Sequence, residues 1–192
     1  RAFLEGWRRH SRHHFKVLAL PGRHFKWRMR QAPLVFAEQV ESLHKQGERF
    51  DALWCTSMLD LAAFRGLCPS VAALPSVVYF HENQLTYPSR HADPRDLHFG
   101  LTNMTTALAS IVSQRTNNSD QTPCVWRNSA YSRDSFLDTL DDRLRQMPDH
   151  TPIDAVESIR KHSAVHHPGS DPIGMTTNKP RATPTLLWAA RW

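Results

Sequence analysis

Short apolar runs alternate along the chain with longer stretches whose apolar residues recur at helical spacing. The apolar runs predict strands at residues 15–20, 53–55, 76–80 and 124–127. The periodic stretches predict helices at residues 2–13, 32–46, 61–66, 95–109, 132–145 and 153–162. Strands that alternate with helices in this way predict an α/β fold with a mostly parallel, doubly wound sheet.

This pattern divides the 192 residues into three parts. Residues 1–169 carry the alternating strands and helices, and we expect them to form one Rossmann-like domain. Residues 170–185 contain three Pro and few apolar residues, which is typical of a linker. Residues 186–192 begin with an apolar run that predicts the first strand of a second, truncated domain. Because folds of this kind open on a central strand and this chain opens on a helix, we also expect the first domain to lack its first strand.

Composition narrows the class of protein. A hydrophobic fraction of 40% with six Trp is typical of a folded domain, and no apolar run is long enough to span a membrane. Three cysteines without a C-x-x-C pair favour reduced thiols and a cytoplasmic location. The seven glycines form no dinucleotide-binding, P-loop or nucleophile-elbow motif, which disfavours dehydrogenases, kinases and esterases alike. No segment indicates a protein partner.

Positive charge is concentrated near the N-terminus. The chain holds 24 Lys and Arg against 18 Asp and Glu, and residues 1–30 contain nine of these cations and a single acid, Glu5. Such a cluster produces a positive field that attracts phosphate groups, whether of RNA or of a nucleotide sugar. A solvated basic face has the same composition, so both interpretations stay open at this point.

The first candidate site follows the predicted strand 76–80, where His81, Glu82, Asn83 and Gln84 come in succession. In an open α/β sheet, ligands bind just beyond the carboxyl ends of the strands. An imidazole and a carboxylate can move protons there, and the two amides can hydrogen-bond hydroxyl groups. The alternative is a hydrogen-bonded turn that only ends the strand.

The second candidate site is the segment 20–30, which we expect to be a loop after the strand 15–20. It interleaves basic and aromatic residues, which suits phosphate contact and base stacking. The residues we expect to make these contacts are Lys26, Trp27, Arg28 and Arg30. The alternative, which the sequence leaves open, is that Phe25 and Trp27 fill the core while the charges point outward.

Two further features favour ordinary structural roles. His10 and His14 have the i, i+4 spacing of a helical metal-ligand pair, but no third ligand is arranged nearby and the neighbouring arginines repel a cation. We therefore expect no metal. Asn128 and Ser129 follow a predicted strand, and we expect one of them to cap the next helix rather than to act in catalysis.

The chain also contains five segments of unusual composition: LALPGRHFKWRMR, YFHENQLTYP, NSAYSRDSFLDTL, RQMPDH and LLWAARW. In this order, they resemble the N-terminal region of the tRNA-queuosine α-mannosyltransferase family. The resemblance implies a retaining glycosyltransferase of the GT-B type, with two Rossmann-like domains and the active cleft between them. It implies transfer of mannose from GDP-mannose to queuosine in a tRNA, without a metal or other cofactor. The polar segment 113–123 and Arg127, where we expect an aromatic residue, depart from the family.

The resemblance also suggests roles for single residues. In related enzymes a His at a strand end faces the reacting sugar, and His81 matches it; we expect His81 and Glu82 to be catalytic. Arg191 matches an Arg that holds the donor diphosphate, whereas the Lys that accompanies it would lie beyond Trp192. The expected acceptor contacts are Lys26, Trp27, Arg28, Arg30, Asn83, Gln84 and Tyr87.

Two other functions fit the same residues. One is a GT-B transferase whose acceptor is a lipid or a glycan, because basic charge also suits anionic lipid surfaces. The other is an RNA-binding module without chemistry, which predicts salt-dependent binding that is indifferent to nucleotide sugars. Since a donor pocket needs the second domain, we expect the chain alone to be inactive.

Overall fold

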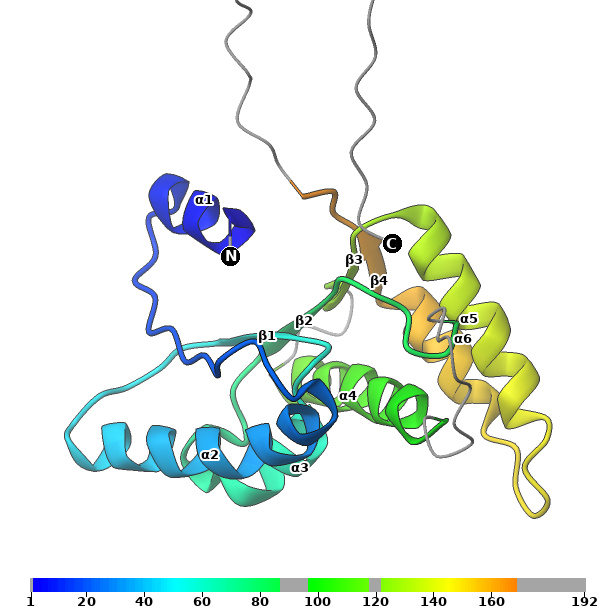
Figure 1. Ribbon diagram of the computed structural model, residues 1–192, viewed down its shortest axis with the longest axis horizontal. Helices are drawn as coiled ribbons and strands as arrows, with labels where there is room; N and C mark the ends of the chain where they lie inside the picture. The colour runs from blue at the N-terminus through cyan, green and yellow to red at the C-terminus, as the bar shows by residue number, and fades with distance from the viewer. Residues whose placement is uncertain (1, 87–96, 118–121, 169–192) are drawn as a thin grey trace, which may run out of the picture.

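The computed structural model describes residues 2–86, 97–117 and 122–168 as an α/β domain (Figure 1). The predicted linker, the predicted strand at 186–190, Tyr87 and Arg191 lie outside these residues. The elements, in chain order, are α1 (Ala2–His10), α2 (Phe25–Lys45), β1 (Leu53–Thr56), α3 (Leu61–Leu67), the 3-10 turn η1 (Pro69–Val71), β2 (Ser76–Phe80), α4 (Leu97–Thr116), β3 (Val125–Arg127), α5 (Ala130–Leu144), α6 (Ile153–Lys161) and β4 (Ser163–Val165).

The four strands form one parallel sheet. Their order is β1-β2-β3-β4, with Trp54 aligned with Val77, Tyr79 with Trp126, and Trp126 with Ala164. The predicted parallel, Rossmann-like α/β architecture is therefore confirmed. A doubly wound sheet requires a reversal of strand order. The described strands follow the sequence order without one, so this part of the sheet is wound in one direction.

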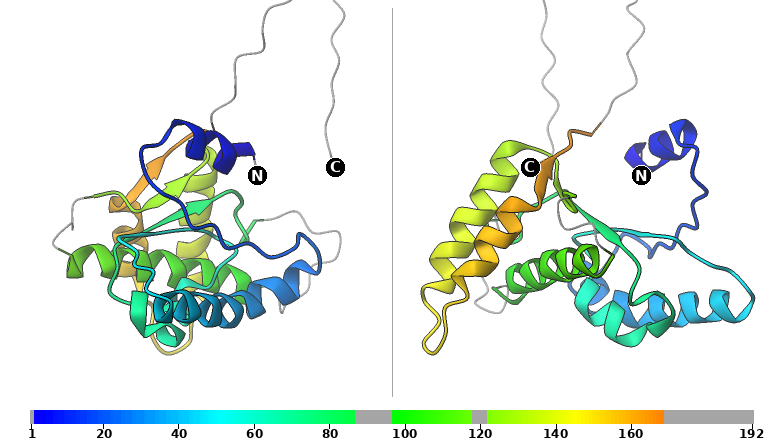
Figure 2. Two further views of the ribbon diagram at one scale, coloured as in Figure 1. Left: turned by 90° about the vertical axis from the view of Figure 1, so that its left-hand side faces the viewer. Right: turned by 180° about the vertical axis from the view of Figure 1, so that it is seen from behind.

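The two faces of the sheet are covered differently. Val78, Phe80 and Val125 point toward α3–α6 and pack with them in the main hydrophobic core. The opposite face carries Trp54, Tyr79 and Trp126, and α1 lies across it, on the far side of the sheet from α2, α3 and α4 (Figures 1 and 2). Trp7 of α1 fixes this position.

The ring centroid of Trp7 lies 5.3 Å from that of Trp54 and 6.5 Å from that of Trp126. Phe15 packs against Trp7 at 5.0 Å. Aromatic contacts of this kind add about 0.5–1.5 kcal/mol to the burial of the rings. They hold α1 on the aromatic face of the sheet.

Helix α4 packs on the sheet through polar side chains, and this explains why its length was underestimated. It reaches Thr116, whereas apolar periodicity ends near Ala109. Ser110 and Gln114 both donate to the main-chain oxygen of Ser76, at 2.8 and 3.0 Å. A buried position of this helix is thus filled by a group that satisfies a carbonyl oxygen, which a count of apolar residues does not detect. The segment 113–123 begins as the last turn of this helix.

Two predictions about the first thirty residues are wrong. Residues 15–20 form no strand, because within the described part of the chain no backbone hydrogen bond joins them to another strand, although Leu18 and Leu20 pack against the core. Residues 25–31 form the first turns of α2 instead of a loop. Pro33 lies inside this helix, one residue after its predicted start at Ala32.

Candidate active site at the carboxyl edge of the sheet

The ends of the four parallel strands bring polar residues to one edge of the sheet. Ser57, His81, Asn128 and His166 follow β1, β2, β3 and β4 respectively. Backbone hydrogen bonds continue between these residues and the neighbouring strands: Ser57 N donates to Tyr79 O at 3.1 Å, and His166 N donates to Arg127 O at 2.8 Å. The four positions are therefore neighbours in space.

The ring and the main chain of His81 each contact a neighbouring residue. Its ring stands edge-on to that of Tyr79, with centroids 4.6 Å apart and an interplanar angle of 80°. Its carbonyl oxygen accepts a hydrogen bond from Asn128 Nδ2 at 2.8 Å. The Tyr79 hydroxyl donates to the carbonyl oxygen of His166 at 3.1 Å, so one tyrosine connects the ends of β2 and β4.

The protein around His81 favours its neutral form. The residue is exposed at one edge of the sheet, yet partial desolvation by the surrounding protein lowers its pKa. A neutral imidazole can accept a proton or a hydrogen bond from a hydroxyl group, as acceptor activation requires. The geometry therefore allows acid–base chemistry at this edge.

The residues after His81 form a turn as well as a polar cluster. Asn83 Oδ1 accepts from Leu85 N at 3.0 Å, and its Nδ2 donates to Ser135 Oγ of α5 at 3.2 Å. Both polar groups of this nearly buried side chain are thus engaged within the protein. Gln84 Nε2 donates to Glu82 Oε2 at 3.4 Å, and both side chains are half-buried. Asn83 shapes the loop, while Glu82 and Gln84 remain accessible at its surface.

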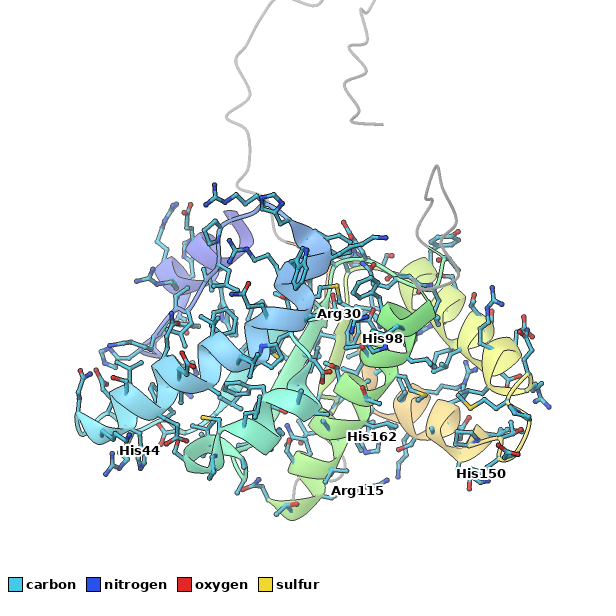
Figure 3. The ribbon with its side chains drawn as sticks, turned by 60° about the horizontal axis from the view of Figure 1, so that its bottom comes forward. Arg30, His44, His98, Arg115, His150 and His162 are labelled. Atoms are coloured by element: carbon cyan, nitrogen blue, oxygen red, sulfur yellow. The ribbon has the colours of Figure 1, made fainter. Side chains whose placement is uncertain are left out.

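The start of α2 lies near the same edge. The rings of Phe25 and Phe99 are 5.7 Å apart, and the Arg30 guanidinium lies over Phe99 at 5.8 Å. Phe99 belongs to the first turn of α4; Figure 3 shows Arg30 beside this end of the helix, near His98. Gly100 lies so close to Leu85 that a Cβ at position 100 would overlap its side chain. The predicted basic segment and the loop after His81 are therefore joined through Phe99, Gly100 and Leu85.

The first turn of α2 is electrostatically unusual. It contains no acid and begins after His24, whose φ of 54° lies in the left-handed region and whose side chain makes no capping hydrogen bond. Lys26, Arg28 and Arg30 place positive charge at the helix end that already carries a positive partial charge. Uncapped amides and cations together favour an anion at such a position.

Trp27, one of two aromatic residues in this turn, points outward. Trp27 is 74% exposed, so it is not a core residue, whereas Phe25 is 42% exposed and packs against Phe99. Arg28 Nε donates to the carbonyl oxygen of Arg23 at 3.3 Å, which anchors this arginine to the preceding turn. The interpretation of Trp27 as a core plug is therefore wrong, and a flat ring is available for stacking.

Two groups at this edge were not predicted to be site residues from the sequence. Asn128 follows a predicted strand but was expected at most to cap a helix, and His166 follows β4, a strand that the sequence did not predict. His166 stacks on Trp126, with centroids 4.3 Å apart. The expected cap is confirmed: Ser129 Oγ accepts from Ser132 N at 3.1 Å and begins α5.

Arg127 is the most unusual residue near this edge. Its side chain is 1% exposed, and its guanidinium lies between the rings of Phe80 and Phe136, 3.8 and 3.9 Å from their centroids. None of its three nitrogens has a hydrogen-bond partner among the described residues. Burial lowers its pKa to about 9. The position expected to be aromatic thus holds a cation inside an aromatic cluster.

Two absences among the described residues bear on metals and membranes. No group of three or more His, Cys, Asp or Glu side chains there is arranged to hold a metal ion. None of the helices in these ranges is long and apolar enough to cross a membrane.

Comparison with known proteins identifies the family. A family model described as tRNA-queuosine alpha-mannosyltransferase N-terminal matches residues 1–170. The chain belongs to this family. It is 33% identical over 150 residues to a tRNA-queuosine alpha-mannosyltransferase of Drosophila melanogaster. That match covers 78% of this chain and 36% of the relative, so the chain spans about a third of the length of this relative.

No solved structure matches the chain significantly. The family match confirms the resemblance inferred from the five sequence segments and agrees with the parallel α/β sheet.

Proposed function

We propose that this chain is the acceptor-binding part of an enzyme that transfers mannose from GDP-mannose to queuosine in tRNA. The family match supports the reaction, and the coverage of its relative supports a longer working enzyme with a second domain. The observation that carries the proposal is the position of His81 at the carboxyl edge of a parallel sheet, beside Glu82 and tied to Asn128. The residues 1–169 place the acceptor, and residues 170–192 lead through a linker into a donor domain, where Arg191 contacts the diphosphate.

The proposed chemistry follows from the groups at this edge. His81 faces the reacting sugar and the acceptor hydroxyl of queuosine, and its neutral ring accepts a hydrogen bond from that hydroxyl. Glu82 assists in moving the proton, and Gln84 and Tyr87 contact the acceptor. Departure of the diphosphate requires no metal in this scheme, because cations of the donor domain stabilise its negative charge. The start of α2 binds the RNA: Arg28 and Arg30 contact phosphates, Lys26 adds charge, and Trp27 stacks on a base.

Single-turnover transfer of radiolabelled mannose from GDP-mannose to a queuosine-containing tRNA tests the proposal on the full-length protein. Replacement of His81 by Ala should slow the chemical step by roughly 10²–10⁴ while tRNA affinity changes little. His150, which is exposed in the turn between α5 and α6, offers a matched control. Near-normal turnover of the His81→Ala protein would reduce His81 to a structural role and remove the proposed site.

An RNA-binding module without chemistry is the second candidate, favoured by the cations and the exposed Trp27 at the start of α2. It predicts tRNA binding whose affinity is the same for tRNA with and without queuosine, and no transfer by the full-length protein. Mannose transfer that requires queuosine excludes it.

A further inference from the structure

A second basic surface lies on α1 and the short segment that follows it. Arg8, Arg9 and Arg12 are exposed there, and we call them the α1 basic surface. The sequence from Gly6 to Ala37 contains eight Lys and Arg and no acid. Lys16 is neutralised by Glu48 at 3.1 Å, but no carboxylate among the described residues pairs with Arg8, Arg9 or Arg12. Unpaired cations in a segment without acids are poised for an anionic partner.

The position of α1 connects this surface to the candidate site. Trp7 packs on Trp54 and Trp126. Trp54 stacks on Tyr79 with centroids 5.9 Å apart, and Tyr79 contacts the His81 ring. The start of α2 reaches the same edge from the other side of the sheet, through Phe99 (Figures 1 and 2). Two positive surfaces therefore flank the strand ends.

The contacts of α1 favour RNA over a lipid membrane as the partner. A basic helix binds a membrane by burying its apolar face in the lipid. Here Trp7 is already packed on the sheet, and the arginines are the groups that face outward. A polymer with evenly spaced phosphates can reach the arginines of α1 while another part of it occupies the strand ends.

We propose that the α1 basic surface is a second RNA-binding surface, which contacts phosphates of the acceptor tRNA away from the modified nucleoside. This inference rests on the proposed function for the identity of the RNA. The surface contributes affinity and salt dependence and takes no part in the transfer chemistry. Arg8, Arg9 and Arg12 each neutralise one phosphate, so counterion release sets the size of the effect.

The test compares RNA binding of the 192-residue chain and two triple variants over a range of salt concentrations. An unmodified tRNA transcript is the probe. The first variant carries Arg8→Gln, Arg9→Gln and Arg12→Gln. The control carries Arg143→Gln, Arg160→Gln and Lys161→Gln, which removes the same charge from exposed positions on α5 and α6. Circular dichroism confirms that both variants fold.

The first variant should reduce the slope of log K against log salt by about 2–3, because each lost phosphate contact lowers it by roughly 0.7–0.9. The control should keep the slope of the wild type. A wild-type slope in the first variant, or equal losses in the two variants, overturns the inference and leaves the reaction, tested through His81, unaffected. Binding of the chain to phosphatidylserine vesicles that is lost in the first variant while RNA binding persists would assign the surface to a membrane and also overturn it.

Discussion

Replacing the buried Arg127 by methionine should stabilise the domain. The guanidinium is enclosed by Phe80 and Phe136 and has no hydrogen-bond partner among the described residues. A flexible apolar side chain of similar length can fill the same space without carrying a charge into it. The substitution thus removes the cost of burying a charge that makes no hydrogen bond.

The magnitude follows from the pKa of Arg127, which burial lowers to about 9. Each unit is worth about 1.4 kcal/mol, so keeping the cation buried costs roughly 5 kcal/mol at neutral pH. Two desolvated cation–π contacts offset this by about 2 kcal/mol each. A net gain of about 1–3 kcal/mol in the free energy of unfolding is therefore expected for Arg127→Met, which raises the Tm by roughly 2–10 °C for a domain of this size.

The sign of the pH dependence gives an independent check. The pKa of Arg127 is lower in the folded than in the unfolded state, so the cost is fully present below pH 9 and is relieved as the pH rises above it. The advantage of the Met variant should accordingly shrink above about pH 9. Urea unfolding of the wild type and of Arg127→Met at pH 7.5 and at pH 10 measures both effects.

Arg127→Lys serves as the matched control, because it keeps the charge and loses the planar group that stacks on the two rings. The expected order of stability is Met, then Arg, then Lys. If Arg127→Met is less stable than the wild type at pH 7.5, the guanidinium makes favourable polar interactions and the reasoning is refuted.

Two further predictions concern other groups. Asn128→Ala removes the hydrogen bond to the His81 carbonyl and should lower kcat for the proposed mannose transfer by the full-length protein about tenfold, with little change in KM for tRNA. The control is Asn117→Ala, which removes a comparable bond to Ala73 O at 2.8 Å. Equal kcat for the two variants would contradict a positioning role of Asn128. Burial raises the pKa of Cys55 to about 12 and also raises the pKa values of Cys68 and Cys124. Thiol reagents at pH 8 should therefore label the native protein far more slowly than the urea-unfolded protein, as mass spectrometry can measure. Rapid labelling of any of the three cysteines in the native state would refute this.

Sequence patterns located the elements whose buried residues are apolar. The strand Ser76–Phe80 has the predicted bounds because every position after the first is apolar or aromatic. The patterns failed where tertiary contacts decide the structure. Helix α4 continues on buried polar residues, and β4 is three residues long and, among the described strands, pairs with β3 alone. The strand 15–20 was overpredicted, since an apolar run becomes a strand only beside a hydrogen-bonding neighbour.

For the candidate site, the strand-end rule placed His81 correctly at the carboxyl edge, and the family resemblance pointed to the same residue. The rule could not show that Asn83 is engaged by Leu85 and Ser135, because these bonds depend on how the loop meets α5. It also could not show that a helix begins at Phe25, because a first turn that contains Lys26 and Arg28 and no acid contradicts the usual helix-start signal.

The order of the strands has a consequence for how the domain is made. The strands β2, β3 and β4 each pair with the strand that precedes them along the chain, so each of them finds a neighbour that is already synthesised. Pairing in sequence order keeps paired strands closer along the chain than a reordered parallel sheet would, which lowers the loop-closure cost of forming each pair. As the chain leaves the ribosome, β1 and β2 can pair around α3 before α4 is complete, and β3 and β4 are then added at the growing edge. The carboxyl edge that carries His81 is thus assembled progressively, and its last member, His166, arrives only when nearly the whole domain has been translated.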